Sequence, residues 1–60
     1  MNETQNKIEL GDNVIVTLPE IPWEFQASVI DIIEESGKII VEDQDGDVFE
    51  CVETNLVLDV

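Results

Sequence analysis

The sequence predicts an all-β protein in the form of a small antiparallel barrel of five strands. In most of the stretch from residue 13 to residue 52, apolar residues recur at every second position, which is the period of a half-buried strand. Turn signals that contain glycine, at residues 34–37 and 43–47, divide this stretch into segments of strand length. We therefore expect three consecutive antiparallel strands in the middle of the chain, with one strand before them and one after them.

The chain is long enough for one domain only. A domain of 60 residues buries only about 60% of its unfolded surface, so it usually needs a compact barrel, a covalent staple or a partner. Cys51 is the only cysteine and histidine is absent, so neither an internal disulfide nor a zinc site is expected. We expect residues 1–7 to be a flexible N-terminal tail and residues 8–60 to be the single barrel domain, with Ile8 and Leu10 at its rim.

The first strand is expected at residues 13–18, where the inward positions hold two valines and a leucine. Pro19 and Pro22 end this strand, because each removes a backbone donor and fixes a φ angle. The stiff loop between them presents Trp23 at a defined place. An aromatic side chain in that position is either a binding feature or a cap over the end of the barrel, and both interpretations stay open.

The second strand, residues 25–33, changes its pattern half way along. Apolar and polar residues alternate up to Val29, and three isoleucines follow within four positions. A helix is the competing interpretation, but the run is rich in β-branched residues and lacks a stripe with a period of 3.6 residues. A bulge or a sharp bend near Asp31 accounts for the change of face.

The third and fourth strands, residues 38–42 and 47–52, form a hairpin with two possible registers. A two-residue loop would place a glutamate among the core residues. A three-residue loop at residues 44–46 with a glycine bulge pairs Val41 with Phe49 and separates the apolar from the charged side chains. We therefore predict the second register.

A single 3₁₀ turn is expected at residues 53–56, and a short strand at residues 57–60 is expected to close the barrel. Strand parity then predicts which side chains form the core. They are Val14, Val16, Ala27, Val29, Ile39, Val41, Phe49, Cys51 and Leu56.

The stretches WEFQASVIDI and KIIVEDQDGDVFECVETNLVLDV resemble the Tudor and KOW branches of the SH3-like barrels. Tudor domains carry an aromatic pair, which corresponds here to Trp23 and Phe25, followed by an alanine and a β-branched stretch. A turn, a further strand and a late leucine, here Leu56, complete the pattern. The resemblance covers most of the chain and implies a five-stranded SH3-like fold.

In Tudor domains, an aromatic residue in the turn helps to form a cage for methylated Lys or Arg. The matching position in this sequence is Asp45, so the resemblance implies a cage that lacks one wall. Such a cage can still hold a cation through the remaining rings and the nearby carboxylates. KOW-like barrels often contact RNA or RNA polymerase through basic loops, which this chain lacks.

Acidity is the dominant feature of the composition. There are 15 Asp and Glu residues against 2 Lys and Arg residues, which gives a formal net charge of −13. Contacts with phosphates require Lys and Arg, so direct binding to nucleic acid is not expected, and an anionic membrane surface would repel the chain. Basic partners would be attracted. The other interpretation is that the acidity only keeps a small domain soluble.

No catalytic residue, cofactor or metal site is predicted, and the protein is not expected to be an enzyme. A barrel this small without histidine offers little cleft for catalysis. The acidic turn at residues 43–47 is too short for a calcium loop, and no cationic neighbour is present in the sequence to activate Cys51. A lone thiol and a polar start without an apolar leader favour the cytoplasm.

We therefore expect a non-enzymatic protein-interaction module that binds a basic protein or peptide. Binding is expected to centre on Trp23 and Phe25, while Glu20, Glu24 and Asp45 steer the partner. The alternative is an inhibitor that mimics nucleic acid and places carboxylates where a DNA- or RNA-binding protein expects phosphates. The sequence leaves the oligomeric state open between a monomer and a weak homodimer.

The free energy of unfolding is expected to rise with added sodium chloride near neutral pH. Fifteen acidic side chains on so small a body repel one another, and the Debye length is about 10 Å at 0.1 M salt. Mild acid should act in the same direction, except where particular carboxylates are specifically paired. Thermal midpoints at low and high sodium chloride test this, and equal midpoints would show that the charges are already well separated.

Overall fold

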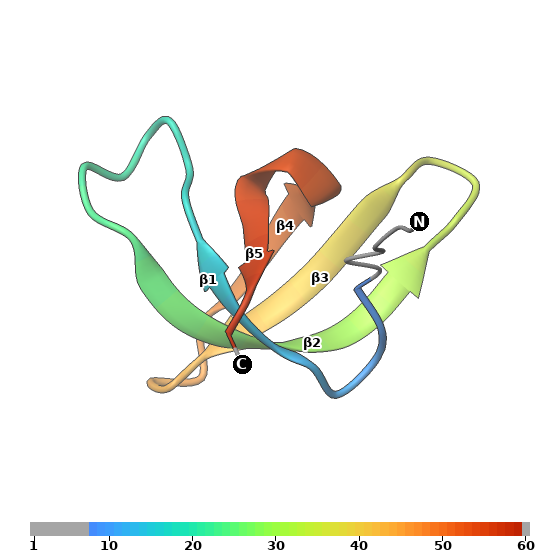
Figure 1. The fold of residues 1–60 in the computed structure, drawn as a ribbon, viewed down its shortest axis with the longest axis horizontal. Coiled ribbons are helices and arrows are strands. Elements are labelled where there is room, and N and C mark those ends of the chain that lie inside the picture. Colours follow the sequence, from blue (N-terminus) through green and yellow to red (C-terminus); the bar gives the residue numbers. More distant parts are fainter. Residues whose placement is uncertain (1–7, 60) are drawn as a thin grey trace, which may run out of the picture.

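Five antiparallel strands form a single sheet (Figure 1). The computed structural model describes residues 8–59; the predicted tail at residues 1–7 lies outside the described residues, as does Val60. The elements in chain order are β1 (Asn13–Val16), β2 (Phe25–Ile33), β3 (Lys38–Asp43), β4 (Val48–Val52), a 3₁₀ turn η1 (Glu53–Asn55) and β5 (Leu56–Leu58).

The strand order in the sheet is β4-β3-β2-β1-β5, so β4 and β5 are its edge strands. No α-helix occurs in the part of the chain that the structure describes. The prediction of an all-β chain with five antiparallel strands is confirmed. The sheet is strongly curved and is not closed by pairing between its two edges.

β2 is the longest strand and has the predicted bounds. It pairs with β1 from Phe25 to Ser28 and with β3 from Ala27 to Ile33. Its register with β3 shifts between Val29 and Asp31, which makes residue 30 the extra residue of a bulge and confirms the predicted irregularity. The bulge lets β2 bend, so that it sweeps beneath the other strands (Figure 1).

The hairpin of β3 and β4 has the register predicted for the three-residue loop, with Val41 opposite Phe49. Gly46 has a φ of 88°, which only glycine adopts without strain in this kind of bulge. The backbone N–H of Gly46 donates to the carbonyl of Asp43 at 3.1 Å, and the N–H of Asp43 donates to the carbonyl of Asp47 at 2.9 Å. The sequence therefore located this turn correctly.

Several strand ends differ from the prediction. β3 ends at Asp43 rather than at residue 42, and β4 begins at Val48 rather than at residue 47. β1 ends at Val16 rather than at residue 18, because the N–H of Thr17 donates to the carbonyl of Asn55 at 2.9 Å and no longer belongs to the ladder with β2. β5 begins at Leu56, directly after η1, and ends at Leu58. The end of β1 and the start of β5 differ from the prediction where the chain at η1 pairs with the end of β1.

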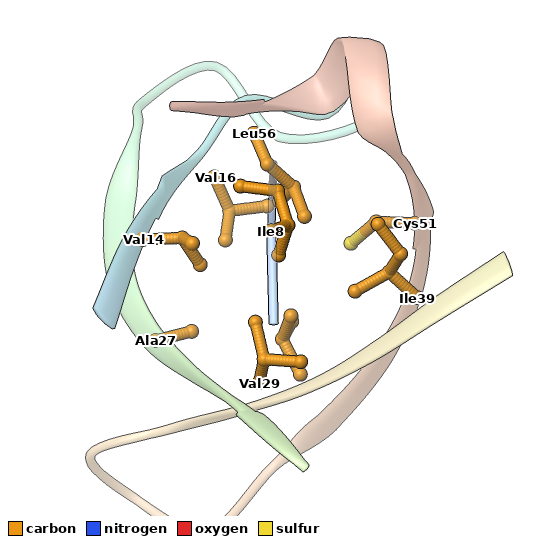
Figure 2. Packing of buried hydrophobic residues seen from close by; sticks show 9 residues of the cluster. Ile8, Val14, Val16, Ala27, Val29, Ile39, Cys51 and Leu56 are labelled. Atoms are coloured by element: carbon orange, nitrogen blue, oxygen red, sulfur yellow. The ribbon is translucent and has the colours of Figure 1, made fainter. Parts of the chain in front are cut away.

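The core lies on the concave side of the sheet, where side chains from all five strands meet (Figure 2). Eight of the nine predicted core residues are buried, and Ile8 joins them. Phe49 is the exception, because it is only half-buried and packs against the edge of the core. The buried residues are Ile8, Val14, Val16, Ala27, Val29, Ile39, Val41, Cys51 and Leu56.

Val41→Asp is expected to unfold the domain. Val41 has no exposed surface, and an unpaired carboxylate in its place would cost several kcal/mol. The total stability of a domain this small should lie near the low end of about 5–15 kcal/mol. Far-UV circular dichroism and dispersion of the amide NMR spectrum measure the outcome.

Val57→Asp is the matched control, because Val57 also lies in a strand but is 65% exposed. This variant should remain folded. A folded Val41→Asp variant with native amide dispersion would contradict the core assignment.

Candidate functional site

A hollow of about 430 Å³ lies beside the start of β2, between the loop that follows β1 and the loop that joins β3 to β4. Aromatic rings and carboxylates make up most of its lining. The aromatic residues are Trp23, Phe25 and Phe49, and the acidic residues are Asp43, Asp45 and Asp47.

Phe25 and Phe49 form the inner wall of this hollow. Their ring centroids are 5.0 Å apart and the ring planes are inclined by 50°, a favourable tilted arrangement. Phe25 is the first residue of β2, and Phe49 comes from β4, which lies two strands away in the sheet. Both rings are partly buried and pack against the edge of the core.

Trp23 forms the outer wall. The loop that carries it contains a turn centred on Pro19 and Glu20, in which the N–H of Ile21 donates to the carbonyl of Leu18 at 3.1 Å. The Trp23 side chain is 66% exposed, so it does not cap the core. A large apolar surface is therefore held in solvent beside the Phe25 and Phe49 rings.

The carboxylate of Asp43 organises the acidic loop. One of its oxygens, Oδ1, accepts hydrogen bonds from the backbone N–H groups of Asp45 and Asp47, both at 2.9 Å. This arrangement is an Asx-type turn, in which an aspartate side chain stands in for a backbone acceptor. The Asp43 carboxylate therefore stabilises the loop, whereas Asp45 and Asp47 are exposed residues that line the hollow.

A chain of side-chain hydrogen bonds ties this loop to β2. The amide Nε2 of Gln44 donates to Oε1 of Gln26 at 3.3 Å, and Nε2 of Gln26 donates to Oδ2 of Asp59 at 2.6 Å. Gln26 follows Phe25 in β2, so the acidic loop is fixed relative to the aromatic wall. The hollow is preformed, and its walls need little ordering when a ligand binds.

The structure brings together three of the five residues predicted for the binding site, which are Trp23, Phe25 and Asp45. Glu20 and Glu24 are exposed and do not line the hollow, so they can act only through longer-range attraction. Sequence reasoning missed the contribution of Phe49, because strand parity placed it on the core face. It also missed Asp47, which was weighed only as a metal ligand.

Cys51 is a free thiol in the core. Burial raises the pKa of the Cys51 thiol, because desolvation disfavours the thiolate. Raising that pKa lowers the thiolate fraction at neutral pH, so Cys51 behaves as a small apolar residue and not as a nucleophile. Among residues 8–59, no three side chains of His, Cys, Asp and Glu converge on a point where they could hold a metal ion.

A scan against protein families and searches of curated proteins and solved structures find no match to this chain. The described part of the chain also contains no helix of the length and hydropathy that would cross a bilayer. The chemistry of the hollow is therefore the observation on which a functional interpretation can be built.

Proposed function

We propose that this protein is a non-enzymatic interaction module that binds a basic protein or peptide in the hollow beside the start of β2. The observation that supports this proposal is the combination of three aromatic rings with two exposed carboxylates, from Asp45 and Asp47, around one preformed hollow. Within residues 8–59, no Lys or Arg lines this hollow.

The ligand group that fits this lining is the cationic end of a Lys or Arg side chain. The faces of aromatic rings attract a cation, with Trp the most effective of the three types, and the attraction is strongest where water is partly excluded. The carboxylates of Asp45 and Asp47 add direct Coulomb attraction, and the negative charge of the whole domain raises the association rate.

We also propose that the curved sheet is an SH3-like barrel of the Tudor or KOW type. The long bent β2 shared by two neighbouring strands, and the 3₁₀ turn before β5, are consistent with that class. Phe49 adds a third ring to the lining, alongside Asp45 at the position where Tudor domains have an aromatic residue. A methylated Lys or Arg is therefore a second ligand to compare with the unmodified side chain.

The alternative function is mimicry of nucleic acid, in which rows of carboxylates replace phosphates on the surface of a DNA- or RNA-binding protein. It uses acidic residues over a wide surface and has no need of the aromatic rings. The two functions therefore respond differently to loss of Trp23 and to loss of charge elsewhere.

Trp23→Ala is expected to weaken binding of a lysine-containing peptide by about 2 kcal/mol, mainly through faster dissociation. The probe is the blocked peptide GKGSKGSKG, with its lysines either unmodified or trimethylated, and a version with glutamate in place of lysine serves as the negative control. Val57→Ala, at a similarly exposed position outside the hollow, is the matched control. Binding that is unchanged in a folded Trp23→Ala variant would contradict the proposal.

Neutralising Glu20 and Glu24 to Gln is expected to slow association and to flatten its dependence on salt, with little change in the dissociation rate. Stopped-flow measurements at several sodium chloride concentrations separate the two rates. Glu34→Gln with Glu35→Gln removes the same charge at the opposite end of the domain and should have a smaller effect. If only the control pair abolishes binding of a recovered cellular partner, the mimicry function takes the place of the module.

A further inference from the structure

A second and larger hollow, of about 580 Å³, lies at the other end of β2. It is bordered by the turn that precedes β1 and by the turn at residues 34–37. Figure 1 shows this second turn and the loop that carries Trp23 at opposite ends of the long axis of the molecule, which measures 36 Å. The two hollows therefore belong to different ends of the same domain.

Four of the residues that line the second hollow carry large apolar side chains. Ile8 and Ile39 are among them, and both are buried with their side chains in the core (Figure 2). Ile32 is half-buried and packs against the core, and Leu10 stands at the rim with 64% of its surface exposed. Gly37 also lines the hollow, and no atom lies within 4 Å of the position that a Cβ would take there, so this side is open.

Leu10 is held in its exposed position by the backbone around it. The N–H of Gly11 donates to the carbonyl of Val29, and the N–H of Val29 donates to the carbonyl of Asp12, both at 2.9 Å. The carboxylate Oδ2 of Asp12 accepts from the N–H of Glu9 at 2.9 Å. These hydrogen bonds fix the backbone of the turn against β2. Leu10 is therefore held at the surface, since its backbone lacks the freedom of a mobile loop.

Three of the residues that line this hollow are acidic. Glu9, Glu34 and Glu53 come from three separate segments of the chain, and each is exposed. Within the described residues, no Lys or Arg lines the hollow. Lys38 is adjacent in sequence to Gly37, but its Nζ lies 3.3 Å from Oε1 of Glu50 on the outer face of the β3–β4 hairpin.

We propose that this hollow is a second docking surface, which accepts an apolar side chain of a partner protein segment in which that side chain is flanked by Lys or Arg. Ile32, Ile39 and Leu10 supply the apolar contact, and the three glutamates face the flanking cations. A second copy of this chain would bring a further net charge of −13, and an anionic membrane would be repelled, so charge complementarity selects a basic partner.

The second surface is independent of the hollow that contains Trp23, and its ligand differs in kind. The Trp23 hollow takes a cation against aromatic rings, whereas this one takes an apolar side chain with cations around it. A basic partner with both features could engage both ends, and about ten residues or more of extended chain would be required to span the long axis. Simultaneous engagement would raise the overall affinity without any new contact.

The test uses the full chain and two blocked synthetic peptides, KKLLKK and KKSSKK. Amide NMR shifts caused by KKLLKK should cluster at residues 8–10, 34–39 and 53, and KKSSKK should bind more weakly by about fivefold or more. Leu10→Ser should weaken KKLLKK about fivefold and leave KKSSKK unchanged, whereas Val57→Ser should change neither. Because Leu10 and Val57 are similarly exposed, both variants should remain folded.

A pair of double variants separates local from general electrostatics. Glu34→Gln with Glu53→Gln should weaken KKLLKK more than Glu20→Gln with Glu24→Gln at the opposite end of the domain, although both pairs remove the same charge. Equal effects of the two pairs, equal binding of the two peptides, or shifts confined to residues 21–25 and 43–49 would each overturn the proposal. The last of these results would leave the Trp23 hollow as the docking site, so the two proposals fail separately.

Discussion

One extra residue in β2 is the constraint on which the rest of the structure depends. β2 pairs with β1 from Phe25 to Ser28 and with β3 from Ala27 to Ile33, and its register with β3 shifts at residue 30, where the strand bends. The bend brings the side chains of β1 and of the β3–β4 hairpin to opposite sides of one interior. β2 is nine residues long, and each of its ends borders one of the two hollows.

The apolar core and the surface charges contribute very differently to stability. Apolar burial provides the stability, because no polar or charged side chain of residues 8–59 is buried. The ion pair between Lys38 and Glu50 joins two side chains that are about half exposed, so it contributes little. The remaining acidic residues lie where water screens them, and the domain tolerates a high net charge that would be costly in its interior.

Two aspartates stabilise turns of the backbone, although the sequence alone does not distinguish them from the acidic residues around them. Asp12 and Asp43 each direct a carboxylate into their own turn, where it accepts backbone hydrogen bonds. The turns they hold are those that shape the two hollows. The same residue type therefore serves two purposes here, since some carboxylates fix the backbone while Asp45 and Asp47 remain directed to solvent at a hollow.

The sequence by itself determined the strands, the bulge in β2, the register of the β3–β4 hairpin and eight of the nine predicted core residues. These features follow from local rules, which are the two-residue period of a strand and the need for glycine at positive φ. Only the tertiary structure decided that Phe49 lines a hollow with Trp23, and that Leu10 stands beside three glutamates. Strand parity gives the face on which a side chain lies, but the place where the core ends depends on segments that are distant in sequence and meet only when the sheet bends.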